Sequence, residues 1–265
     1  MTNHLADQTW PEVAEAVADG ARTVILPLGA TEQHGPHLPM GTDTVRAQAL
    51  AERLAAHLTD AIIAPALPIG CSDEHIGFAG LLSLEHETLA SVIVDCARRM
   101  SGWGVRRLVL LSAHGGNVRA IESACARLGD ELPELEVRPL GCSTAASAAL
   151  IAIARADGIS PEALGLHAGE GETSEMLCLR PDLVRRERIV AGYVGPADDL
   201  MSRLIDAGLR PITPTGTLGD ARYADGSRGE RYLAQEIADY RRCLAHSASS
   251  AAAKDRDPPM SGATA

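Results

Sequence analysis

A short loop rich in glycine and proline carries the most reactive residues of this sequence. Between residues 29 and 44 this loop contains two carboxylates and two imidazoles, on Glu32, His34, His37 and Asp43. Carboxylate oxygens and imidazole nitrogens are the ligands that zinc and manganese take in proteins. The apolar run over residues 23–28 precedes the loop and is typical of a buried strand. A strand that ends in candidate ligands predicts an active site at the carboxyl edge of an α/β sheet.

Three further segments concentrate polar residues in the same way. They are residues 70–78 with Ser72, Glu74 and His75, residues 112–117 with His114 and Asn117, and residues 167–174 with His167, Glu170 and Glu172. Five of the nine histidines lie in these four segments. Three of the segments follow apolar runs, so parallel strands would bring them to one edge of a sheet. This clustering predicts one site with several metal ligands.

Each segment also has a simpler interpretation. Residues 73–75 would serve equally as a solvated loop, and residues 114–117 as a turn that cradles phosphate before a helix. Glu170 and Glu172 would be favourable charges at a helix N-terminus, whatever their chemistry. The combination of Glu32, His34, Asp43 and His114 favours the metal site over these alternatives.

The elements that must position these residues alternate between strand and helix. The apolar patterns predict strands near residues 23–29, 61–65, 107–112 and 135–140. They predict helices near residues 43–58, 86–103, 118–128, 143–156, 173–179 and 230–244, with a loop over 158–171. Repeated strand–helix units indicate a three-layer α/β/α sandwich around a mainly parallel sheet. We expect one domain over residues 1–246 and a disordered tail rich in Ala, Ser and Pro over residues 247–265.

Composition excludes several classes of partner. The net charge of −11 argues against nucleic acid and against an anionic membrane surface as partners. Apolar runs are too short to cross a membrane, and the N-terminus lacks the pattern of a signal peptide. The six cysteines are scattered and suggest no disulfide framework, so we expect a cytoplasmic protein.

The four polar segments resemble the signatures of the creatininase family of metal-dependent amidohydrolases. The leading signature, Gly-x-x-Glu-Gln-His-Gly-Pro-His-Leu-Pro-x-x-Thr-Asp, stands at residues 29–43. The others are Ser-x-Glu-His-x-x-Phe at 72–78, His-Gly-Gly-Asn at 114–117 and His-Ala-Gly-x-x-Glu-Thr-Ser at 167–174. The resemblance implies a three-layer α/β/α domain, a homohexamer and two divalent metal ions per chain. Zinc or manganese would suit these ligands best, and iron(II) also fits.

The resemblance also implies a role for each candidate. Glu32 and His114 would hold one metal, His34 the other, and Asp43 would bridge them. In creatininase itself a Glu two residues after the third-block His completes the second metal, but Gly116 stands there in this chain. Glu172 is the expected replacement, and Glu170 remains an alternative.

The remaining candidates would contact the substrate or move protons. His167 would donate a proton to the leaving nitrogen, and Glu172 or Glu170 could share that task. We expect Ser72, Glu74, His75 and Asn117 to bind the substrate.

These roles predict an enzyme that hydrolyses a C–N bond of a small amide or lactam through a metal-bridging hydroxide. Creatinine itself is not expected, because the tryptophans that close the creatininase pocket have no counterpart here; the two of this chain are Trp10 and Trp103. One alternative is a mycofactocin-type peptidase that releases a short C-terminal fragment from a peptide. Another is a catalytically silent binding or scaffold protein with the same fold.

Overall fold

The central sheet has four parallel strands. The computed structural model describes residues 3–141, 147–195 and 200–254 of the 265-residue chain. In these ranges the strands are β1 (Thr23–Leu28), β2 (Ala61–Ile63), β3 (Arg107–Ser112) and β4 (Glu136–Leu140), in the order β2-β1-β3-β4. All four lie where the sequence predicts them. β2 ends at Ile63, two residues before Pro65, the predicted last residue of this strand.

The register of the sheet brings two of the polar segments together. Thr23 of β1 lies opposite Arg107 of β3, and Leu28 lies opposite Ser112. Both strands therefore end at the same level, and the chain leaves them into the loops that carry Glu32 and His114.

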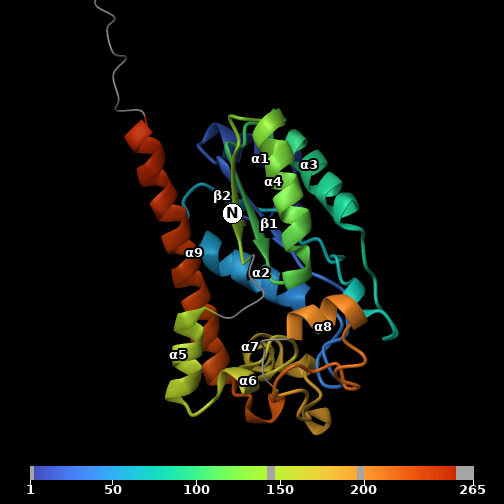
Figure 1. Ribbon diagram of the computed structural model, residues 1–265. Helices are drawn as coiled ribbons and strands as arrows, with labels where there is room; N and C mark the ends of the chain where they lie inside the picture. Colours follow the sequence, from blue (N-terminus) through green and yellow to red (C-terminus); the bar gives the residue numbers. More distant parts are fainter. Residues whose placement is uncertain (1–2, 142–146, 196–199, 255–265) are drawn as a thin grey trace, which may run out of the picture.

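Each face of the sheet has its own apolar core, because alternate residues of a strand point to opposite faces. Val24, Leu26 and Leu28 pack in a cluster with residues of α3 (His86–Gly102) and α4 (Val118–Glu131). Ile25 packs in a second cluster with residues of α2 (Thr42–Ala55) and α9 (Gly226–Lys254). Figure 1 shows these helices on the two sides of the sheet. The three-layer α/β/α prediction is confirmed.

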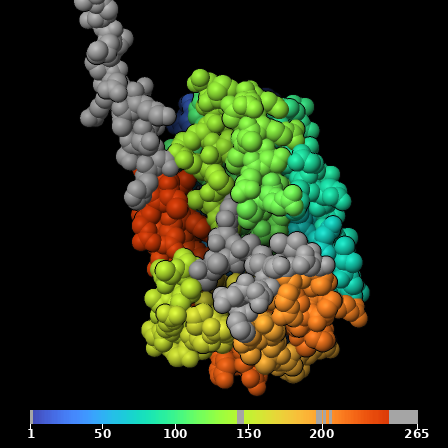
Figure 2. Space-filling view, viewed as in Figure 1, coloured from blue at the N-terminus to red at the C-terminus, as the bar shows by residue number. Residues whose placement is uncertain are grey.

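In the described ranges the remaining α-helices are α1 (Trp10–Ala18), α5 (Ala148–Ala156), α6 (Pro161–Leu164), α7 (Glu170–Leu179) and α8 (Leu200–Ala207). Two of them correct the predicted loop over residues 158–171. Ser160 caps α6 by accepting a hydrogen bond from the Ala163 amide, and α7 begins at Glu170 instead of Thr173. In Figure 2 the segments from α5 to α8, yellow to orange, gather at one end of the molecule.

The C-terminal helix is longer than predicted. We expected it to end at Leu244, and α9 continues to Lys254. Residues 143–146 of the predicted Ala-rich helix and residues 255–265 of the predicted tail lie outside the described residues. Among the described helices, none combines the length and apolar character that a membrane span requires.

Candidate metal centre

Five buried or half-buried side chains from separate parts of the chain converge at the carboxyl edge of the sheet. They are Glu32 and His34 after β1, Asp43 in the first turn of α2, His114 after β3, and Glu172 in the first turn of α7. The His34 Nε2 atom lies 3.2 Å from Asp43 Oδ1 and 3.8 Å from Glu172 Oε2. The His114 Nε2 atom lies 3.3 Å from Glu32 Oε2, and its Nδ1 lies 3.4 Å from Asp43 Oδ2. The sequence named all five residues as metal ligands.

Among the described residues, candidate ligand atoms also group as Glu32, His34 and His167 and as Glu32, Glu74 and His75, and the five residues above fall into two overlapping groups. Glu32, Asp43 and His114 form one, and His34, Asp43 and Glu172 form the other; within each group the candidate atoms lie within 4.8 Å of one another. Asp43 belongs to both groups. This arrangement agrees with the division between two metals that the resemblance implies.

Main-chain carbonyls fix which nitrogen of two histidines faces the carboxylates. The Glu32 carbonyl lies 3.2 Å from Nδ1 of His34 and can only accept, so Nδ1 donates and Nε2 is left toward Asp43. The Cys71 carbonyl likewise accepts from Nε2 of His114 at 2.8 Å, which leaves Nδ1 toward Asp43. An imidazole that donates one N–H to a carbonyl and directs the other nitrogen at a carboxylate is the usual arrangement of a metal ligand.

The charges of the cluster also call for a cation. Both oxygens of Glu32 and Oδ2 of Asp43 are buried without a hydrogen-bond partner. Burial raises the pKa of the Glu32 carboxyl to about 7. Burial disfavours a charged His34, but Asp43, Glu172 and Glu32 together outweigh it and raise the pKa of His34 to about 9. A divalent ion would satisfy these oxygens, and the O/N donor set suits zinc, manganese or iron(II).

Gly116 has a structural reason for its missing side chain. A Cβ atom at this position would lie 2.0 Å from the Cys71 carbonyl oxygen and 2.5 Å from His114 Nε2. The Glu74 carboxylate occupies nearby space, with Oε1 3.1 Å from the same point. A ligand at residue 116 would therefore require the loop that carries Cys71 and Glu74 to move.

Glu172, the expected replacement, is held firmly at the cluster. Its Oε1 accepts from Arg46 Nη1 at 3.0 Å, and its Oε2 accepts from the Ala168 amide at 2.7 Å. Burial raises the pKa of Glu172, but Arg46 and then His34 outweigh it and lower that pKa below its ordinary value. Arg46 is itself buried and also pairs with Glu175 and Glu236.

Glu170, the alternative to Glu172, is directed elsewhere. Its carboxylate accepts from Ser174 Oγ and Arg228 Nε, each at 2.6 Å, and from the Tyr232 hydroxyl at 2.9 Å. Glu170 is fully buried in these contacts and joins α7 to α9. We therefore assign it a structural role, in place of the metal or catalytic role considered from the sequence.

Asn117 and Ser72 are also less available than the sequence suggested. Asn117 is fully buried, accepts from the Cys71 amide at 3.0 Å and donates to the Gly29 carbonyl at 3.1 Å. It therefore joins the loops that follow the strands, and these contacts argue against the contact with substrate expected from the sequence. Ser72 is fully buried too, and its Oγ lies 3.2 Å from His114 Nε2.

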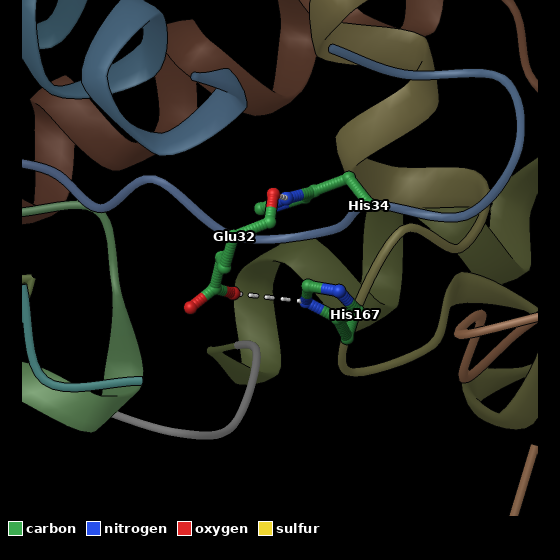
Figure 3. Close-up of side chains that lie close together, drawn as sticks. All are labelled: Glu32, His34 and His167. Carbon is green, nitrogen blue, oxygen red and sulfur yellow. Dashed lines mark hydrogen bonds and ion pairs between the residues drawn. The ribbon is translucent and has the colours of Figure 1, made fainter. Parts of the chain in front are cut away.

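Two further histidines, His75 and His167, also lie close to Glu32. His75 Nε2 lies 3.2 Å and His167 Nδ1 lies 3.6 Å from Glu32 Oε1. Figure 3 shows the Glu32 carboxylate directed at the His167 ring. Burial first, and then the charge of His34, lower the pKa of His167 to about 4, so its imidazole is neutral. Glu74 lies at the edge of this group, with its side chain 34% exposed and Oε1 3.9 Å from His75 Nε2.

Sequence reasoning missed two residues of the centre, Arg46 and Gln33. Arg46 lies three positions after Asp43 and thus on the same side of α2, a spacing that could have indicated it. Gln33 stands inside the leading signature between two named ligands, and its side chain contacts both His75 and His167.

Comparison with known proteins identifies the family. The family profile described as creatininase, creatinine amidohydrolase, matches residues 6–244 of the 265. The chain belongs to the creatininase family. Its characterised relatives hydrolyse C–N bonds, so the prediction of an amidohydrolase is confirmed at this level.

Two named relatives differ in substrate. The chain is 34% identical over 246 residues to a mycofactocin precursor peptide peptidase of Mycobacterium ulcerans, covering 90% of this chain and 86% of the relative. It is 31% identical over 258 residues to a creatinine amidohydrolase of Pseudomonas putida, covering 89% and 94%.

Solved creatininase structures share the fold. One described as creatininase Mn has a TM-score of 0.74 and 30% identity, covering 90% of this chain and 97% of that one. A creatininase variant of the Zn–Zn type has the same TM-score and identity, covering 90% and 96%. Both metals that the sequence favoured therefore occur in similar proteins.

Proposed function

We propose that this chain is a metal-dependent hydrolase that cleaves an amide C–N bond by water attack. The observation that carries the proposal is the buried group of Glu32, His34, Asp43, His114 and Glu172, in which three carboxylate oxygens have no hydrogen-bond partner. Glu32, Asp43 and His114 would hold one divalent ion, and His34, Asp43 and Glu172 a second. Zinc or manganese is the proposed metal. When bound, such ions lower the pKa of water and polarise a carbonyl.

The residues of the chain divide the remaining tasks. Arg46 and the Ala168 amide fix both oxygens of Glu172, so this carboxylate serves as a ligand and does not exchange protons. His167 donates its Nε2–H to the Gln33 carbonyl at 2.7 Å, so it has no free N–H for a leaving group. This argues against the proton donor expected from the sequence.

Glu74 is the best remaining candidate for proton transfer. Its side chain is 34% exposed, whereas those of Glu32, Asp43 and Glu172 are 0%, 2% and 18% exposed. It can therefore reach both the centre and an incoming substrate, accept a proton from water and pass it to the amide nitrogen. Glu74→Gln should lower kcat strongly and leave the metal content unchanged.

Two substrate classes compete, and the relatives favour a peptide over a small cyclic amide. Identity to the mycofactocin precursor peptide peptidase is 34%, against 31% to the creatinine amidohydrolase. The absence of pocket tryptophans also counts against creatinine, since Trp10 is 82% exposed and Trp103 packs against the core beside α3. We propose release of a short C-terminal peptide fragment, with a small amide or lactam as the second candidate. A cytoplasmic location and a homohexamer stay predictions from the sequence.

The test uses full-length protein stripped with a chelator and reloaded with zinc or manganese. Peptide and small-amide panels are incubated with it, and products are identified by mass spectrometry. Metal-dependent release of a C-terminal fragment, lost in Asp43→Asn, would support the peptidase. Hydrolysis of small amides alone would favour the second candidate. Full metal loading without hydrolysis in either panel would point to a catalytically silent binding protein.

A further inference from the structure

The two histidines beside Glu32 place different ring nitrogens next to it, and Gln33 determines this for both. His75 has its protonated nitrogen there, and His167 has its unprotonated nitrogen there. The side chains of His75 and His167 are 5% and 11% exposed, both lie close to Glu32 Oε1, and their ring centroids are 4.7 Å apart. Distance alone therefore does not separate their roles. Their partners on the far side of each ring do.

The orientation of the Gln33 amide is fixed at both ends. Its Oε1 accepts from the Gly35 amide at 2.8 Å, and its Nε2 donates to the Gly216 carbonyl at 3.1 Å. If Oε1 and Nε2 were exchanged, the side-chain NH₂ would face the Gly35 N–H, and the side-chain oxygen would face the Gly216 carbonyl oxygen. The Gln33 Nε2 therefore has one further hydrogen to donate.

That second hydrogen goes to His75. The Nε2 of His167 already donates to the Gln33 main-chain carbonyl at 2.7 Å, so it cannot also accept from the Gln33 side chain 3.0 Å away. The Nδ1 of His75, 3.0 Å from Gln33 Nε2, is the remaining acceptor. A neutral His75 then carries its hydrogen on Nε2, the nitrogen that lies 3.2 Å from Glu32 Oε1 without forming a hydrogen bond to it.

His167 has its unprotonated ring nitrogen next to Glu32. Because its hydrogen is on Nε2, the lone pair of Nδ1 faces Glu32 Oε1, 3.6 Å away. Its ring lies 4.3 Å from that of His34, and ligand atoms of Glu32, His34 and His167 lie within 4.8 Å of one another. Figure 3 shows these three side chains close together, with a dashed line between Glu32 and His167. His167 therefore repeats the pattern of His34 and His114, in which a main-chain carbonyl holds the N–H and the other nitrogen faces a carboxylate.

We infer that His167 is a metal ligand through Nδ1, beside Glu32 Oε1. His75 also lies within 4.8 Å of ligand atoms of Glu32 and Glu74, but it keeps its hydrogen on Nε2 and binds no metal. Gln33 is the positioning residue that separates the two roles. This inference rests on the proposed function, since it adds a nitrogen ligand to the same centre.

Nuclear magnetic resonance of full-length protein labelled with ¹⁵N-histidine tests the inference directly. Long-range ¹H–¹⁵N spectra report which ring nitrogen carries hydrogen and which one binds Zn²⁺. Signals are assigned by their loss in His167→Asn and in the matched control His75→Asn. Without metal, we expect hydrogen on Nε2 in both neutral rings. On adding Zn²⁺, the Nδ1 signal of His167 should move to the position of a metal-bound nitrogen, and that of His75 should not.

Zn²⁺ affinity, measured by competition with a chromogenic chelator, gives a second readout. His167→Asn should weaken binding about tenfold or more, and His75→Asn by much less. Comparable losses, or a metal shift on His75, would overturn the inference. If Zn²⁺ moves the signals of His34 and His114 but leaves His167 unchanged, the inference fails and the proposed function stands. If Zn²⁺ binds nowhere, both fail.

Discussion

Arg46 should contribute far more to the free energy of unfolding than an arginine on a solvent-exposed helix face would. It reaches from α2 to Glu172 and Glu175 on α7 and to Glu236 on α9, and its side chain is only 10% exposed. Replacing it with Met would leave these carboxylates buried together without their cation. Removal of one partner from a buried ion pair costs about 3–5 kcal/mol. We expect Arg46→Met to lower the free energy of unfolding by about this amount.

The chain provides a matched control in the same helix. Arg53 of α2 makes two hydrogen bonds to Glu230 of α9, at 2.7 and 2.6 Å, but these side chains are 31% and 52% exposed. An exposed pair contributes about 1 kcal/mol or less. Urea unfolding of metal-free protein should therefore separate Arg46→Met from Arg53→Met by about 2–4 kcal/mol. Arg46→Lys keeps the charge but loses the planar guanidinium group. Its free energy of unfolding should therefore lie between those of Arg46→Met and Arg53→Met.

The outcome that would refute this reasoning is equal unfolding midpoints for Arg46→Met and Arg53→Met. That result would mean that water molecules, or a rearrangement of nearby side chains, stabilise the buried carboxylates once the Arg46 cation is gone. Zn²⁺ affinity is an independent readout, because Arg46 also holds Glu172. We expect Arg46→Met, and not Arg53→Met, to weaken it.

Three further predictions concern the surroundings of the centre. Glu170→Gln should cost about 3 kcal/mol in urea unfolding, because it leaves Arg228 buried without that partner, while Zn²⁺ affinity stays close to wild type. Burial first, and then Glu175, raise the pKa of Glu236 to about 8, so the folded protein holds a proton that the unfolded chain releases near its ordinary pKa of 4.5. Stability should therefore fall as pH rises from about 5 to 8, and Glu236→Gln should flatten this dependence in denaturation series; an unchanged slope would contradict it. Gly116→Ala should lower the free energy of unfolding by about 1–3 kcal/mol, because its Cβ would be overpacked. A smaller loss of stability in thermal unfolding would show that the loop carrying Cys71 and Glu74 moves easily.

The sequence predicted the candidate ligands that lie close to strand ends. Glu32, His34 and His114 each follow a strand within a few residues, and parallel pairing of β1 with β3 was enough to bring them together. Asp43 was predictable as well, since it opens the helix that follows the same loop. Local pattern and one rule of sheet topology carry this much of the site.

The roles of the remaining residues depended on contacts that no local pattern encodes. Asn117 resembled a substrate contact by its position, but its amide is used up by the Cys71 amide and the Gly29 carbonyl, from two other loops. The difference between His75 and His167 depends on a glutamine that both rings share and on the Gly216 carbonyl far along the chain. Such assignments need the full set of donors and acceptors.

The choice between Glu170 and Glu172 shows how a distant element determines a ligand. Two residues apart on α7, they lie on different faces of the helix, and either could have faced the metals. Arg228 and Tyr232 of α9 bind Glu170, and this fixes the rotation of α7 about its axis. The same rotation directs Glu172 at His34 and Arg46. The proposed ligand is thus oriented by side chains nearly sixty residues later in the sequence, while Arg46 and the Ala168 amide hold the Glu172 carboxylate itself.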